Sequence, residues 1–217
     1  MGSNSSKIPT NPYAAISKGF NRECFLEHNR LRAIHNSPNL RLDKKLMNSA
    51  QKHAEAMARE NQLRMQEDIE YGQNAAMQVF SNYLTISGTE VARLWYKHSA
   101  NYDYSENNQF DKRNFTQIVW KNTERVGFGC AINEDFKTVF MVGHYWPPGN
   151  IEGGFLENVI KPRVGDTSSD GWNLLAHDRT MKTTKMRRRR KCHKSNKTEQ
   201  TNRMSTNAYA YSFNTNH

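Results

Sequence analysis

The 217-residue sequence has no long hydrophobic run and no apolar stretch near its start. Its apolar runs, such as residues 139–142, are as short as a strand, whereas a membrane-spanning helix needs about 20 apolar residues. The opening residues, Met-Gly-Ser-Asn-Ser-Ser-Lys, lack the apolar core of a secretory signal. We therefore expect a protein that neither spans a membrane nor is secreted.

Cysteine is also scarce. The three cysteines, Cys24, Cys130 and Cys192, are odd in number and far apart, which excludes both a disulfide framework and a Cys-x-x-Cys metal pair. Cys24 and Cys130 fall in apolar patterns, so we expect them to be buried thiols. Cys192 lies in a basic segment and is a candidate for acylation.

Acidic residues are nearly absent from the last quarter of the chain. The whole chain has 31 Lys and Arg against 21 Asp and Glu, a net charge of +10. Residues 1–160 hold 18 basic and 17 acidic residues, and residues 161–217 hold 13 and 4. Because the basic part also has little apolar periodicity, we predict a mostly disordered tail over 163–217, an N-terminal anchor segment over 1–17 and one domain over 18–162.

Apolar periodicity predicts helices first and strands later. We expect helices over about 20–35, 43–57 and 89–100, with Asp43 and Thr89 as N-caps, and a short helix or turn over 114–120. Two β-rich runs, 126–132 and 137–146, predict an antiparallel hairpin, whereas 61–82 is polar and irregular. This order indicates an α+β protein with helices packed on an antiparallel sheet, and we expect its core to hold Trp95, Trp120 and Trp146.

Two strings resemble known signatures. Residues 113–123 read RNFTQIVWKNT and residues 140–151 read FMVGHYWPPGNI, and the shorter strings EHNRLR, LDKKL, YGQNA and VARLWY precede them in the chain. Over 18–162 the chain resembles the CAP superfamily, which comprises the cysteine-rich secretory proteins, antigen 5 and the pathogenesis-related 1 proteins. The resemblance implies a three-layer α-β-α sandwich with a central antiparallel sheet. Gly143 stands where secreted members carry a Cys, which points to the intracellular, Golgi-associated branch.

The resemblance also marks four cleft positions. Family members with a complete cleft hold a divalent metal between two His and two Glu, and the motifs place Met65, Gln73, His98 and Asn114 there. Neutral amides are weak zinc ligands and one histidine is too few. We therefore predict a degenerate cleft with no metal, cofactor or catalytic residue, in which His98 is hydrogen-bonded. The alternative is a residual metal-dependent hydrolase that uses His98.

The two ends of the chain point to a membrane surface. The N-terminus fits the N-myristoylation pattern, with Gly2 as the modified residue. One myristoyl chain binds membranes only marginally, so stable attachment needs a second signal, which a basic segment can supply. The candidate membrane-binding residues are Lys182, Lys185, Arg187, Arg188, Arg189, Arg190, Lys191, Lys194 and Lys197.

These observations predict a non-catalytic protein on the cytosolic face of the Golgi or another membrane. We expect it to bind an anionic membrane surface and partner proteins, and a homodimer stays open. The arginine run also suits nuclear import or RNA contact, because phosphates attract Arg and Lys wherever they occur. Aromatic residues do not interleave with the run, so nucleic acid ranks last, after a solvated tail with no assigned role.

Overall fold

The computed structural model describes residues 13–67, 69–80, 87–135, 137–162 and 208–211. In this part of the chain the strands form one sheet in the order β1-β3-β4-β2-β5. Neighbouring strands are antiparallel, except that β1 runs parallel to β3. The strands are β1 (Arg41–Leu42), β2 (Gly72–Val79), β3 (Arg125–Ile132), β4 (Thr138–Trp146) and β5 (Ala208–Tyr211).

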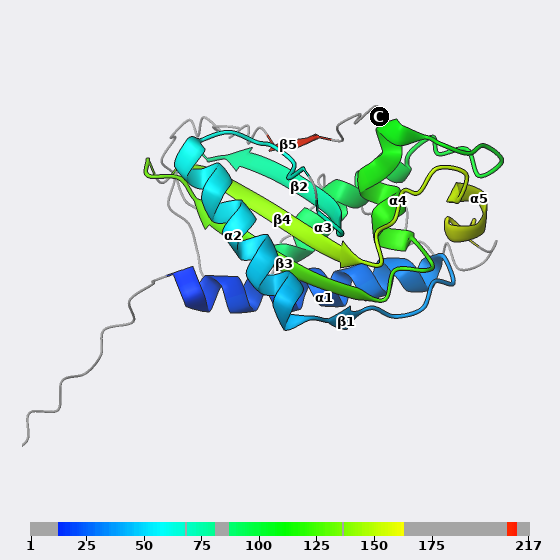
Figure 1. Cartoon of the computed structure of the whole chain (residues 1–217), viewed down its shortest axis with the longest axis horizontal. Helices are drawn as coiled ribbons and strands as arrows, with labels where there is room; N and C mark the ends of the chain where they lie inside the picture. The colour runs from blue at the N-terminus through cyan, green and yellow to red at the C-terminus, as the bar shows by residue number, and fades with distance from the viewer. Residues whose placement is uncertain (1–12, 68, 81–86, 136, 163–207, 212–217) are drawn as a thin grey trace, which may run out of the picture.

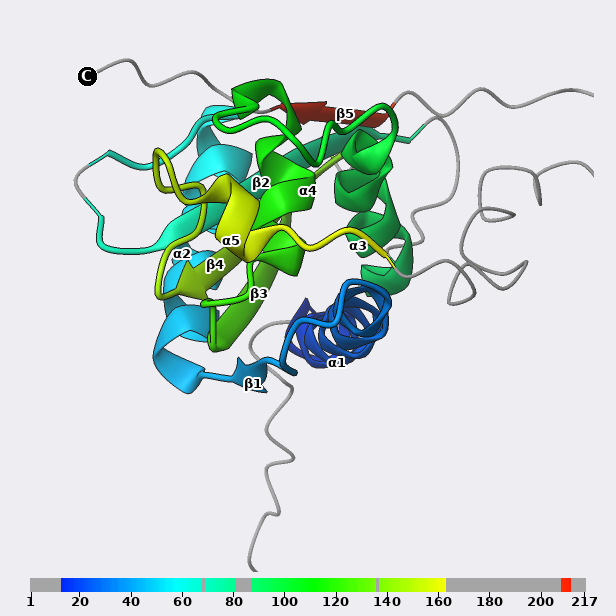
Figure 2. The ribbon, with the colours of Figure 1, turned by 90° about the vertical axis from the view of Figure 1, so that its right-hand side faces the viewer.

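Helices cover both faces of this sheet (Figures 1 and 2). Helix α2 (Lys44–Glu60) lies on one face, and α1 (Tyr13–Ile34), α3 (Gly88–Tyr96) and α4 (Arg113–Val119) lie on the other. A short α5 (Phe155–Asn158) and two 3₁₀ turns, η1 (Lys97–Ser99) and η2 (Phe110–Lys112), complete the described elements. The predicted α+β class and the three-layer sandwich are confirmed.

The sheet separates two hydrophobic layers, because successive side chains of a strand point to opposite faces. The larger layer lies under α1, α3 and α4 and includes the fully buried Trp95 and Phe128. The smaller layer lies under α2 and includes Met57, Phe140 and Val142. The hairpin of β3 and β4 contributes to both layers and is the centre of the domain.

Helix α2 approaches β3 very closely because the facing strand residues are glycines. A Cβ atom added at Gly127 would lie 2.1 Å from the backbone nitrogen of Met47, and one at Gly129 would lie 2.4 Å from that of Gln51. The Gln51 amide also bonds the edge of the strand, donating to the Cys130 carbonyl at 2.9 Å and accepting from its N–H at 3.2 Å. The two glycines of the string VGFGC therefore set the distance between α2 and the sheet.

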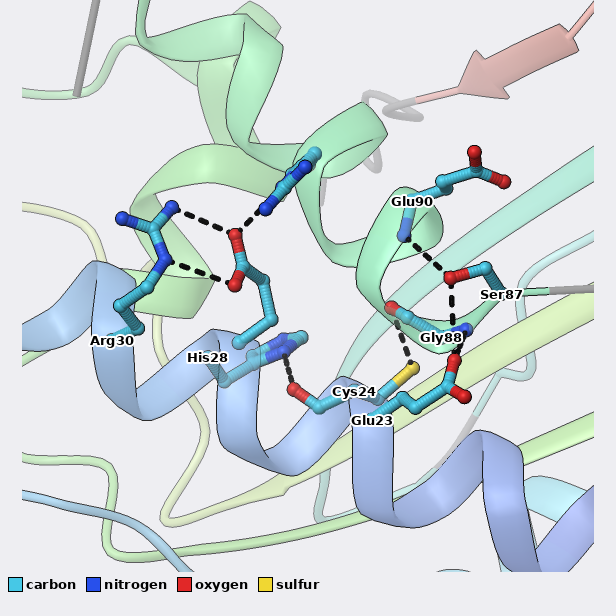
Figure 3. Close-up of polar contacts among 9 residues, drawn as sticks. Glu23, Cys24, His28, Arg30, Ser87, Gly88 and Glu90 are labelled. Carbon is cyan, nitrogen blue, oxygen red and sulfur yellow. Dashed lines mark hydrogen bonds and ion pairs between the residues drawn. The ribbon is translucent and has the colours of Figure 1, made fainter. Parts of the chain in front are cut away.

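The contact between α1 and α3 depends on a few polar groups (Figure 3). The Glu23 carboxylate accepts from the Gly88 N–H at 2.9 Å and from the Ser87 hydroxyl at 3.2 Å, and the Ser87 hydroxyl accepts from the Glu90 N–H at 3.4 Å. Ser87 is therefore the N-cap of α3, and the prediction of Thr89 was wrong. Asp43 is the N-cap of α2, as predicted, and accepts from two backbone N–H groups.

Arg32 is fully buried and connects α1 by hydrogen bonds to the segments that surround the start of β3. Its guanidinium donates at 2.7–2.9 Å to backbone carbonyls of Pro38, Ile118, Trp120 and Thr123, and at 3.5 Å to that of Lys121. Burial lowers the pKa of Arg32 to about 10, so the group keeps its charge at neutral pH. One side chain thus donates hydrogen bonds to several backbone carbonyls from separate segments at once.

Three sequence predictions need correction. Strand β2 lies inside residues 61–82, which were expected to be irregular. Strand β5 lies within 163–217, most of which is outside the described residues, so the mostly disordered tail stays a prediction. Helix α1 begins at Tyr13, earlier than expected. Trp146 is not in the core but is 36% exposed, with the Arg125 guanidinium 4.6 Å from its ring centroid, whereas Trp95 and Trp120 are buried as predicted.

We predict that Arg32→Met lowers the free energy of unfolding by about 3–5 kcal/mol, because several backbone carbonyls lose the hydrogen bonds that Arg32 donates. Urea unfolding measures this. The matched control is Arg41→Met, whose side chain is 79% exposed and lies 3.9 Å from Glu124, and which should change stability by less than about 0.5 kcal/mol. Equal effects of the two substitutions would contradict the role given to Arg32.

Candidate functional site

The first two cleft positions lie at the start of β2 and in the loop before it. The Gln73 side chain holds the backbone of Gln66, accepting from its N–H at 2.9 Å and donating to its carbonyl at 2.8 Å. Met65, next to Gln66, packs on the hydrophobic layer under α2. A carboxylate at position 73 could not donate to the Gln66 carbonyl, so the amide is suited to its present contact.

The other two positions lie where η1 contacts α4. His98 is half-buried in η1, and burial together with the charge of Lys112 lowers the pKa of its imidazole. Its Nδ1 atom is buried and has no hydrogen-bond partner among the described residues, so the prediction of a hydrogen-bonded histidine depends on Nε2 and stays a prediction. Asn114 is buried in α4, and its carbonyl accepts from the Asn74 side chain at 2.9 Å.

A chain of buried polar groups that the sequence did not reveal connects α2 to β4. His53 Nε2 lies 2.9 Å from the Arg64 carbonyl, and because a carbonyl only accepts, the proton of His53 is assigned to Nε2. His53 Nδ1 then accepts from His144 Nε2 at 3.2 Å, and His144 Nδ1 accepts from the Ser49 hydroxyl at 3.2 Å. Burial lowers the pKa of His53 and lowers that of His144 to about 3, so both rings are neutral.

Two further histidines connect α1 to other parts of the domain. His28 contacts the Cys24 carbonyl at 2.7 Å and the Tyr145 hydroxyl at 2.9 Å, and burial lowers its pKa to about 3. His35 contacts the Ile160 carbonyl at 2.6 Å and the Tyr96 hydroxyl at 2.9 Å, and burial lowers its pKa to about 4. These rings therefore act as neutral hydrogen-bonding groups between elements.

The residues of the signature strings hold the scaffold together. The Glu27 carboxylate accepts from Arg30 at 2.7 Å and from Arg93 at 2.8 Å and so connects α1 with α3. The Gln117 side chain accepts from the Gly149 N–H at 2.9 Å and donates to the Thr123 hydroxyl at 3.2 Å. In this chain the signatures specify packing between elements.

The chemistry of these groups bears on metal binding. Within the described ranges, no three His, Cys, Asp or Glu side chains form a group that could hold a metal ion. Cys24 and Cys130 are buried thiols, as predicted, and burial raises the pKa of both. Gln73 and Asn114 offer amides in place of the carboxylate and imidazole that zinc prefers.

Comparison with known proteins agrees with the fold. The profile of the cysteine-rich secretory protein family, CAP, matches residues 25–145. The chain belongs to the CAP family. The human Golgi-associated plant pathogenesis-related protein 1 is 36% identical over 152 residues, which cover 69% of this chain and 97% of the human protein. A probable pathogenesis-related protein of Candida albicans is 31% identical over 137 residues, covering 62% of this chain and 63% of that one.

A solved structure gives independent support for the CAP fold. The structure of BmVAL-1 aligns with a TM-score of 0.52 at 19% identity and covers 76% of this chain and 88% of that one. Gly2, Cys192 and the basic residues of the tail lie outside the described residues, so their roles stay predictions. No described helix is both long and apolar enough to cross a membrane.

We predict that the buried histidines make this CAP domain sensitive to acid. The pKa of each is lower in the folded state than its ordinary value of 6.5, so the unfolded state binds more protons below about pH 6.5. Their contribution to stability is complete above that pH and is lost as the pH falls toward 3–4. Denaturant unfolding between pH 7 and 5 should show a slope approaching about 1.4 kcal/mol per pH unit for each histidine.

The variant His144→Gln removes one of these titrations and should reduce that slope by the share of one histidine. Between pH 7 and 5 most carboxylates stay charged in both states, so they interfere little. A stability that stayed constant over this range, or a slope that His144→Gln left unchanged, would show that the histidines are not held neutral by folding.

We also predict that the domain binds Zn²⁺ no better than an unrelated protein surface, because the cleft positions carry neutral groups. Calorimetry tests this directly. The combined substitutions Met65→His, Gln73→Glu, His98→Glu and Asn114→His should create a stoichiometric site if the four positions correspond to those of complete family members. Submicromolar binding to the natural chain that disappeared in His98→Ala would contradict the prediction.

Proposed function

We propose that this chain is a non-catalytic CAP protein attached to the cytosolic surface of a membrane, where it binds anionic lipid and partner proteins. The domain supplies a stable platform whose polar interior is used for packing. The ends of the chain supply the attachment, through an acyl group on Gly2 and the basic residues of the tail.

The proposal that the chain is non-catalytic rests on the hydrogen bonds of the Gln73 side chain. Its amide oxygen accepts from the Gln66 N–H at 2.9 Å, and its amide nitrogen donates to the Gln66 carbonyl at 2.8 Å. The resemblance to complete family members places a carboxylate at this position. His98 is the one imidazole among the four predicted cleft positions, and burial lowers its pKa. These groups support a cleft whose residues maintain structure and do not activate water.

Membrane attachment is supported by the sequence at both ends. Gly2 is followed by Ser3, Ser6 and Lys7, the pattern that acylation enzymes read. Residues 182–197 contain nine Lys and Arg and no acid. Each basic side chain near an anionic leaflet contributes about 1 kcal/mol, which converts the marginal binding of one acyl chain into stable attachment.

The similarity to a Golgi-associated human protein supports the Golgi as the compartment, because the alignment covers 97% of that protein. The human protein differs in extent, since the alignment covers only 69% of this chain. We infer that the basic run of residues 182–197 supplies an electrostatic signal that adds to the acyl group.

We predict that the acylated chain sediments with vesicles containing anionic lipid and is released as salt rises, because the Debye length shortens to about 3 Å at 1 M salt. Replacing the residues from Arg187 to Arg190 by Ala should weaken this binding to the level seen on neutral vesicles. Gly2→Ala should leave most of the protein in the supernatant. A matched control replaces the basic Lys44 and Lys45, which are exposed at the start of α2, by Ala.

The result separates the alternatives. If the arginine substitutions leave vesicle binding and its salt dependence unchanged, the tail is not the second signal. In that case import assays and RNA binding of the same variants test the nuclear function of the run, which becomes the leading one.

A further inference from the structure

The outer edge of β2 is the place where the described domain accepts a strand from a distant part of the chain. β4 pairs with β2 along its whole length, from Gly72 opposite Tyr145 to Val79 opposite Thr138. On the other side, β5 pairs with residues 75–78 only, in an antiparallel register. Figures 1 and 2 show β5 along this outer edge.

Without β5, the outward backbone groups of β2 would form an open sheet edge. Such an edge pairs readily with any extended segment, and proteins commonly cover it. A four-residue strand is short, and a two-stranded contact of this size is marginally stable by itself. The pairing of β5 with β2 therefore contributes little stability by itself.

The register defines what the edge accepts. Ala208 and Ala210 stand opposite Gln78 and Ala76, and Tyr209 and Tyr211 stand opposite Met77 and Ala75. Ala76 belongs to the hydrophobic layer under α1, α3 and α4, whereas Ala75 and Met77 belong to or contact the layer under α2. Small and aromatic residues of the strand thus alternate with the same period as the two faces of β2.

The two faces also differ in how much of β2 the helices cover. Helix α4 packs on β2, and the Asn74 side chain donates to the Asn114 carbonyl of that helix at 2.9 Å. Helix α2 lies mainly over β3 and β4, so the α2 side of β2 is nearer the border of the layer. A strand that pairs here therefore has alanine in register with the face that α4 covers and tyrosine in register with the more open face.

We propose that the outer edge of β2 is a strand-addition site for an extended peptide of a partner protein with alternating small and aromatic residues, and that residues 208–211 of the chain keep it closed. Backbone pairing would supply the affinity, and the alternation would supply the specificity. Because residues 208–211 belong to the same chain, they compete with a partner peptide at a high effective concentration. The partner therefore binds only when its concentration and affinity outweigh those of the chain's own strand, or when that strand leaves the edge.

The test uses the full chain and a variant with Tyr209→Pro and Ala210→Pro. Two consecutive prolines remove a backbone N–H on either side of the strand, so one of them must fall on the side that faces β2. The matched control, Tyr209→Thr and Ala210→Ser, keeps both N–H groups. Hydrogen exchange of β2 amides should accelerate in the proline variant more than in the control, while the amides of α2 and β3 keep their protection and show that the domain is folded.

A labelled peptide with the sequence of residues 205–214 provides the second measurement. We expect it to bind the proline variant at least about tenfold more tightly than the natural chain, whose own strand competes. Unchanged exchange of β2, or a peptide that fails to bind the proline variant, would overturn the proposal. A natural chain that is a dimer, and a proline variant that is a monomer, would show instead that a second copy fills the edge.

Discussion

The burial of one guanidinium is the constraint on which the arrangement of the CAP domain depends. Arg32 lies inside the protein, and backbone carbonyls of residues 38 and 118–123 converge on it. These carbonyls come from the turn after α1, from the end of α4 and from the segment between α4 and β3, so one charged group connects the first helix to all three. A buried cation is tolerable only when its donors are satisfied, and the chain supplies an acceptor for each direction of the fork.

The same principle extends to the neutral polar groups. His28 connects α1 to β4 through the Tyr145 hydroxyl, and His53 connects α2 to β4 through His144. Strand β4 thus receives one hydrogen-bonded histidine from each covering layer. Because these rings are held neutral, the interior combines many polar groups with little net charge. Gln73 and Asn114, at two of the predicted cleft positions, continue this pattern, because their side chains are neutral amides.

Periodic patterns predicted the helices and the β3–β4 hairpin because their apolar residues recur at the spacing of the elements. Strand β2 was missed because Gln73, Asn74 and two alanines are not typical of a strand, although burial between β4 and the helices makes small residues suitable there. Trp146 was misplaced because an apolar pattern does not show where a sheet ends. Arg32 and the histidine contacts could not be predicted, since their partners are carbonyls and hydroxyls far away in the sequence.

The candidate cleft was accessible only through the family motifs, because no spacing rule connects Met65, Gln73, His98 and Asn114. Motif comparison predicts that these four residues are changed, and the structure shows what Gln73 does, namely form two hydrogen bonds with the backbone of Gln66. Attachment of the domain to a membrane through Gly2 is a proposal that rests on the sequence of the two ends. The most direct test is the intact mass of the protein purified from cells that express it naturally. The account predicts loss of Met1 and one myristoyl group on Gly2, and an unmodified N-terminus would contradict it.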